Sequence, residues 1–152
     1  MEVVPESGRV NAPDVTYRSE GYPLAPSPQT PDRETPMSEP IYPDADIPAK
    51  IAEHGLTGWY LEDGWLRRKY TTDGWPTTLM LVNAVGYLCE AAWHHADLSV
   101  TWGKVWVKLK THSAGGITDK DFLLARKIEE VALWRPHKGG ALEGSPNKFV
   151  RG

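Results

Sequence analysis

Three of the five histidines in this 152-residue chain stand at points where different parts of a fold can meet. His94 and His95 follow a long apolar helical pattern, His112 follows an alternating strand pattern, and Asp121 lies in the first turn of the last helical pattern. Histidine changes its charge near neutral pH, so histidines gathered beside a carboxylate suit proton transfer. The opposing interpretation is a set of solvated or satisfied polar side chains, because a histidine pair alone is a weak signal.

The same residues match a metal site poorly. Neighbouring histidines point in different directions, Cys89 is not at a ligand spacing from them, and no paired carboxylate completes a ligand set. We therefore predict no metal ligands. Cys89 is the single cysteine of the chain and lies in an apolar stretch, so we interpret it as a small core residue that cannot form an internal disulfide.

Hydrophobic periodicity predicts the elements that position these residues. The pattern is helical over 47–54, strand-like over 59–61 and 66–71, helical from about Trp75 to Trp93, strand-like over 98–102 and 104–110, and helical again from Thr118. The Asp63-Gly64 pair between the first two strands is a strong hairpin signal. The order α-β-β-α-β-β-α predicts an α+β fold, with a four-stranded antiparallel sheet and three helices on one face.

Composition divides the chain into three parts. Ten of the 13 prolines fall within the first 50 residues, whereas all seven tryptophans lie between Trp59 and Trp134. We predict a disordered Pro-rich tail over 1–48, a folded domain over 49–134 and a C-terminal tail over 135–152. Met37 is a plausible alternative start within the first tail.

Charge and hydropathy limit the partners of the chain. With 17 basic and 20 acidic residues the formal net charge is -3, which gives no broad positive field for nucleic acid. No apolar run reaches membrane-spanning length, and no leader pattern is evident, so we expect a cytoplasmic protein. The long central helix is apolar on more than one stripe, which predicts a homodimer packed around Leu81, Val85 and Leu88.

Residues 90–122 resemble the signature of the pterin-4a-carbinolamine dehydratases. The matching residues are Glu90, His94-His95, Trp102, Thr111-His112, Ala114-Gly115-Gly116-Ile117-Thr118 and Asp121-Phe122, and the resemblance extends over about residues 56 to 131. It implies the fold described above. It also implies removal of water from a 4a-hydroxytetrahydropterin, with no metal or organic cofactor. The expected proline after the histidine pair is Ala96 in this chain.

The resemblance implies a role for the matching histidines and acidic residues. His94, His95 and His112 would line the pterin pocket, while Glu90 and Asp121 would orient the imidazoles or contact the ring. The departing 4a-hydroxyl needs a proton and the ring N5 must lose one, and groups that titrate near neutral pH suit both transfers. The residues leave open which histidine is the acid and which is the base.

A narrower resemblance implies a binding role. Residues 75–84 and 124–131 are similar to dehydratase-like proteins associated with α-carboxysomes, which act as RuBisCO assembly factors. On this resemblance, our first interpretation is a chaperone that binds RuBisCO subunits in association with carboxysomes. The alternative is an active dehydratase in tetrahydropterin recycling.

The binding surface of such a chaperone would combine aromatic side chains with positive charge. Its predicted residues are Trp102, Lys104, Trp106, Lys108 and Lys110. The opposing interpretation is a solvated strand face whose lysines prevent edge pairing.

Overall fold

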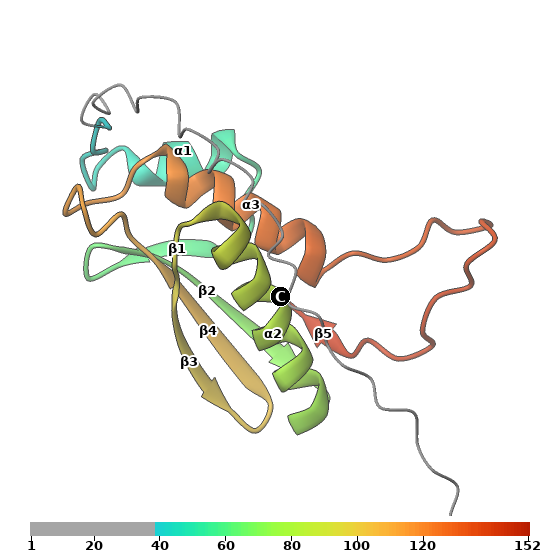
Figure 1. Ribbon diagram of the computed structural model, residues 1–152. Coiled ribbons are helices and arrows are strands. Elements are labelled where there is room, and N and C mark those ends of the chain that lie inside the picture. The colour runs from blue at the N-terminus through green and yellow to red at the C-terminus, as the bar shows by residue number, and fades with distance from the viewer. Residues whose placement is uncertain (1–38) are drawn as a thin grey trace, which may run out of the picture. The chain divides into compact units, whose positions relative to one another are not determined.

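A computed structural model describes residues 39–152 of the protein (Figure 1). Met37 and most of the predicted N-terminal tail lie outside the described residues. The elements are α1 (Ile47–Glu53), β1 (Trp59–Glu62), β2 (Trp65–Thr72), α2 (Trp75–Ala92), β3 (Asp97–Thr101), β4 (Lys104–Leu109), α3 (Asp119–Ala132) and β5 (Val150–Arg151). The structure confirms an α+β fold with three helices and an antiparallel sheet. The short strand β5 was not predicted.

The sheet has the strand order β1-β2-β4-β3, and β5 pairs with the end of β2. Every pairing is antiparallel. The turn between β1 and β2 has positive φ angles at both central residues, 52° at Asp63 and 71° at Gly64. That is the geometry which an Asp-Gly pair favours in a two-residue hairpin, so the predicted hairpin forms where its signal lies.

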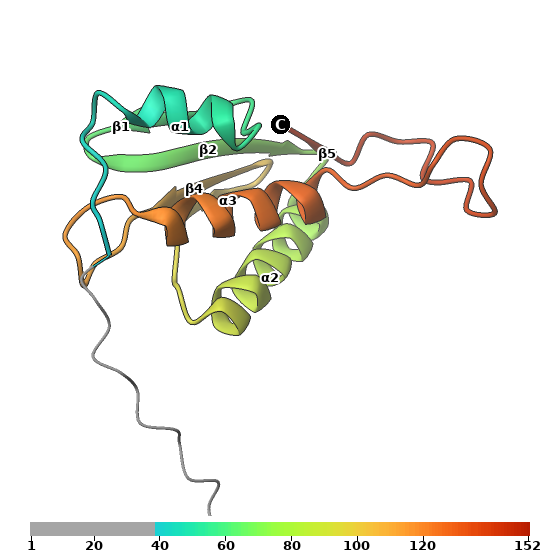
Figure 2. The ribbon, with the colours of Figure 1, turned by 90° about the horizontal axis from the view of Figure 1, so that it is seen from above.

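One face of the sheet forms the core. Val105, Val107 and Leu109 are fully buried and alternate along β4 with more exposed residues, as predicted. Their partners on β2 include the buried residues Leu66 and Tyr70. Helices α2 and α3 contact each other and lie on the same side of β2 and β4 (Figure 2).

Helix α2 is followed by a residue with a left-handed backbone conformation. Trp93 has φ 51° and ψ 39°, and the N–H of His94 donates to the carbonyl of Cys89 at 3.1 Å. This six-to-one bond is the Schellman arrangement, in which glycine is the usual left-handed residue. A bulky residue in this region is a conformational outlier. The bond fixes the direction in which the chain carries His94 away from the helix.

The residues predicted to join two subunits are largely used within the chain. Leu81 and Val85 are only 5 % and 1 % exposed, because they pack into the core of their own domain. The exposed large apolar residues of α2 are instead Trp75, Leu79, Met80 and Tyr87. Any packing of two copies through α2 would therefore use this other stripe. No helix within residues 39–152 is both long and apolar enough to cross a membrane.

Both ends of the described chain touch the domain. On the N-terminal side, the Tyr42 ring packs edge-on against Phe122, with 5.7 Å between ring centroids. On the C-terminal side, the segment after α3 returns to form β5, where Val150 is 6 % exposed (Figures 1 and 2). Arg135 Nη2 donates to the carbonyl of Val150 at 2.8 Å. The predicted C-terminal tail therefore supplies one core residue.

A polar cluster lies beneath the sheet around Glu129. Its carboxylate accepts hydrogen bonds from Trp59 Nε1 at 3.0 Å, Tyr70 OH at 2.6 Å and two nitrogens of Arg68 at 3.0 and 3.2 Å. Burial alone would raise the pKa of Glu129, but the hydrogen bonds from Arg68 and Tyr70 outweigh it and hold this pKa below its usual value.

Candidate functional site

Asp121 is placed by the start of α3. Thr118 is the N-cap residue, and the two residues form a capping box in which the Thr118 backbone N–H donates to Asp121 Oδ2 at 2.8 Å. The Asp121 side chain is fully buried. Oδ2 also accepts a hydrogen bond from Thr111 Oγ1 at 2.8 Å. The carboxylate is therefore held by two donors before any histidine is considered.

His94 is the third hydrogen-bond partner of this carboxylate. Its Nε2 lies 2.7 Å from Asp121 Oδ1, and its side chain is 11 % exposed. A carboxylate can only accept, so in the neutral imidazole the proton is on Nε2 and the lone pair is on Nδ1. The pair thus leaves Nδ1 as the ring nitrogen able to accept a proton from a ligand.

The remaining predicted polar residues form separate contacts. His95 Nε2 lies 3.0 Å from Glu90 Oε2, and both side chains are exposed. The Trp93 indole stands edge-on to the His95 ring, with 5.5 Å between centroids. His112 is exposed and packs edge-on against Trp65 at 5.5 Å. The structure thus pairs His94 with Asp121 and His95 with Glu90, while the His112 ring stands against a different partner.

His94 also lines a cleft of about 460 Å³ between the end of α2 and the first half of α3. Its size lies within the usual range for small-molecule sites. The lining is mostly apolar, with two lysines from α3: Leu88, Ala91, Ala92, His94, Lys120, Leu123, Leu124 and Lys127. His95 and His112 do not line this cleft.

Ala96 replaces the proline that the resemblance leads one to expect. Burial raises the pKa of the Cys89 thiol, and the backbone N–H of Ala96 opposes that rise. A proline has no N–H, so this contact to α2 depends on the departure from the signature.

The predicted binding residue Trp102 lies far from the histidines. Trp102 lies in the turn between β3 and β4, beside Gly74. His112 follows the other end of β4, which is about 20 Å long at ~3.4 Å per residue. The structure therefore does not bring Trp102 to the histidines.

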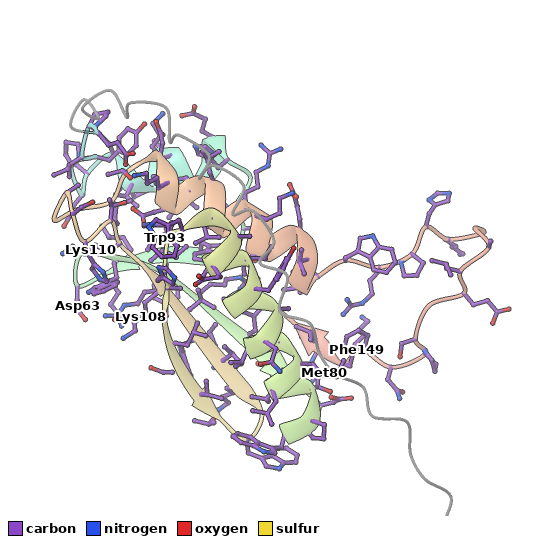
Figure 3. All side chains as sticks on the ribbon, viewed as in Figure 1. Asp63, Met80, Trp93, Lys108, Lys110 and Phe149 are labelled. Carbon is purple, nitrogen blue, oxygen red and sulfur yellow. The ribbon has the colours of Figure 1, made fainter. Side chains whose placement is uncertain are left out.

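The outward side chains of β2 and β4 do form one polar surface. Lys69 Nζ lies 5.9 Å from the centre of the Trp106 ring, and Lys108 and Lys110 lie 5.6 and 5.8 Å from that of Trp65. Lys108 and Lys110 stand near the turn that holds Asp63 (Figure 3). Lys104 is exposed at the other end of β4. We call Trp65, Lys69, Lys104, Trp106, Lys108 and Lys110 the outer face.

Two residues in contact with the site carried no predicted role. Thr111 and Thr118 are 3 % and 0 % exposed, and their hydroxyl oxygens are 2.7 Å apart. Thr118 followed by an acidic residue three positions later is a capping-box pattern, so the sequence contained a signal for the Thr118–Asp121 contact. Thr111 offered no such signal, because threonine at a strand end also reflects β propensity. Within residues 39–152, no group of three histidine, cysteine or acidic side chains is placed to hold a metal ion.

Comparisons with known proteins show which family the sequence matches. The sequence model of the family "Pterin 4 alpha carbinolamine dehydratase" matches residues 41–131. A protein of Aquifex aeolicus named "Putative pterin-4-alpha-carbinolamine dehydratase" is 47 % identical over 76 residues, which cover 50 % of this chain and 77 % of the relative. One of the same name from Roseiflexus castenholzii is 40 % identical over 88 residues, or 58 % of this chain and 92 % of the relative.

A solved structure shares the fold. It is the crystal structure of a transcriptional coactivator/pterin dehydratase from Brucella melitensis, with a TM-score of 0.56 and 23 % identity. The match covers 61 % of this chain and 99 % of that one. Fold and sequence together define a pterin dehydratase-like domain. The chain belongs to the pterin-4a-carbinolamine dehydratase family.

Proposed function

We propose that this protein catalyses dehydration of a 4a-hydroxytetrahydropterin to the quinonoid dihydropterin. The observation that carries the proposal is the His94–Asp121 pair, in which a buried carboxylate holds an imidazole that also lines a cleft. Family membership supports the same reaction. The relatives' names mention the dehydratase alone, which favours it over the assembly role as the first candidate.

The reaction moves only protons and water. The C4a–O bond breaks with its electron pair on oxygen, a proton from an acid converts the departing hydroxyl to water, and a base takes the proton from N5. His94 and His95 each face a carboxylate, from Asp121 and Glu90. A carboxylate stabilises the imidazolium that forms when a histidine accepts a proton. The His94–Asp121 pair, whose imidazole lines the cleft, provides the group for one of the two proton transfers.

The test is the rate of 4a-hydroxytetrahydropterin dehydration above the uncatalysed background. We expect strong acceleration by the native protein and a loss of about 100-fold or more for His94→Gln, the usual scale of general acid–base catalysis. His137→Ala is the matched control, because His137 is exposed in the loop before β5. A folded native protein that leaves the background rate unchanged contradicts the proposal.

A second candidate function is RuBisCO assembly in association with α-carboxysomes. The outer face favours it, since two tryptophans lie among four lysines there. Within residues 39–152, the ion pair that these lysines form joins Lys108 to Asp97 at 3.9 Å. Such a surface suits an acidic protein partner.

Surface substitutions test this second candidate better than truncation, because removal of residues 135–152 would also delete the buried Val150. Trp106→Ala combined with Lys104→Glu should lower the yield of assembled RuBisCO while the domain stays folded. Lys138→Glu, in the exposed loop before β5, is the matched charge control. Normal assembly by the double variant would rule out the outer face as the binding surface.

A further inference from the structure

We infer that Thr111 is a positioning residue for His94, acting through the carboxylate of Asp121. The inference rests on the proposed dehydratase function and adds to it a residue outside the histidine and carboxylate set. No hydrogen bond joins Thr111 directly to His94. Its hydroxyl instead fixes the group that fixes the imidazole.

The backbone of Thr111 is held where its hydroxyl must point at Asp121. Thr111 forms an isolated antiparallel bridge with Gly116, and its N–H donates to the Gly116 carbonyl at 2.9 Å. The side chain is 3 % exposed, and Oγ1 lies 2.8 Å from Asp121 Oδ2. A buried β-branched side chain on a fixed backbone has little rotamer freedom, so the direction of the hydroxyl is set.

A second threonine settles which way the hydroxyl proton points. A hydroxyl has one proton, and Thr111 gives it to Asp121. Thr118 has two acceptors within reach, Thr111 Oγ1 at 2.7 Å and Glu39 Oε2 at 3.3 Å. It donates to Thr111, because the shorter contact between the two hydroxyls has no other proton to fill it. The backbone N–H of Lys120 in turn donates to Thr118 Oγ1 at 3.3 Å. Consecutive bonds that run in one direction polarise each other, which strengthens the last bond, the one to Asp121.

The arrangement divides the two oxygens of Asp121 between two tasks. Oδ2 receives the Thr111 hydroxyl and the Thr118 N–H, both at 2.8 Å, whereas Oδ1 faces His94 Nε2 at 2.7 Å. The carboxylate torsion of aspartate is otherwise broad and roughly two-fold, so the two donors on Oδ2 are what restrict it. Without the Thr111 hydroxyl, one donor remains on Oδ2 and the carboxylate can turn away from His94. The imidazole would then lose its fixed tautomer and orientation.

The experiment replaces the hydroxyl while keeping the shape. Thr111→Val removes it at nearly constant volume, Thr111→Ser restores it, and Thr111→Ala gives a second hydroxyl-free variant should the valine variant fail to fold. Thr78→Val is the matched control, because Thr78 is also fully buried and pairs its hydroxyl with that of Thr72 at 2.6 Å, away from His94. Each variant is studied as the full chain, by ring ¹⁵N chemical shifts of His94 and by kcat and KM for 4a-hydroxytetrahydropterin.

We expect the native protein, Thr111→Ser and Thr78→Val to keep the His94 proton on Nε2. Thr111→Val and Thr111→Ala should show a mixture of tautomers, with kcat lower by about 10- to 100-fold and KM little changed, because misplacement by about 1 Å costs ~100-fold in rate. An unchanged His94 tautomer in a folded hydroxyl-free variant overturns the inference. If the native protein shows no dehydration, the proposed function fails, and the His94 tautomer still decides the role of Thr111.

Discussion

Replacement of Glu129 by alanine should strongly destabilise the domain. The carboxylate is the shared acceptor for Arg68, Trp59 and Tyr70. The Arg68 side chain is 9 % exposed and that of Glu129 is 19 % exposed, so water replaces the lost carboxylate only in part. The substitution therefore leaves one buried cation without its counter-charge and two aromatic side chains without hydrogen-bond acceptors.

The magnitude follows mainly from the unpaired charge. Removal of one partner of a buried ion pair costs about 3–5 kcal/mol of unfolding free energy. Because Arg68 also reaches the carbonyls of Gly58 and Lys69 at 3.3 and 3.5 Å, part of its charge stays solvated by the backbone. We therefore expect about 3–4 kcal/mol, against a total of about 5–15 kcal/mol for a domain of this kind.

The neighbouring residue supplies a matched control. Glu130 lies on the exposed side of α3 and pairs with Arg126 and Lys127 at 3.2 and 2.6 Å. Such surface pairs contribute about 0–1 kcal/mol, so Glu130→Ala should change stability little. Both variants are compared with the native protein by urea unfolding followed by far-UV circular dichroism. If Glu129→Ala costs no more than Glu130→Ala, the cluster does not stabilise the domain and our reasoning is wrong.

Three further predictions concern pH, the C-terminal strand and self-association. Hydrogen bonds hold the pKa of Glu129 below its unfolded value, so the stability that the ionised carboxylate contributes is present above about pH 4.3 and is lost as the pH falls further. When the free energy of unfolding is measured at decreasing pH, Glu129→Gln should therefore lose less stability than the native protein. Val150→Ala should cost about 1–3 kcal/mol by urea unfolding, whereas Leu142→Ala, 64 % exposed on the same segment, should be neutral. We propose a homodimer through the exposed stripe of α2, so light scattering should report at least a dimer for the native protein and a monomer for Met80→Glu with Tyr87→Glu. A monomeric native protein at micromolar concentration contradicts that proposal.

Local signals predicted the elements that have strong local causes. The alternation along β4 and the Asp63-Gly64 turn each depend on residues within a few positions, and the structure contains both. Strand β5 has two residues and so no measurable period, which is why periodicity could not reveal it. The stripe of α2 that faces its own sheet also could not be chosen, because the apolar residues extend around more than one side of the helix.

Some residues of the site could also be predicted from the sequence, and others could not. His94 and Asp121 were identified from the signature, and the structure places them in contact. Thr111 was not assigned a role, because its importance depends on a hydroxyl direction that only the packed chain defines. Trp102 belongs to the same signature as the histidines, but the length of β4 separates it from them.

The carboxylate of Asp121 caps α3 and also holds His94, and this double use affects how the residue can be interpreted in related chains. A lineage that had lost the reaction would still retain the aspartate, because its loss would weaken the start of a helix. The presence of an aspartate at this position is therefore weak evidence of an active enzyme. The side chain of His94 caps no helix, because only its backbone N–H takes part in the end of α2. Replacement of His94 in a relative would therefore be the clearer sign that the domain has been kept for another purpose.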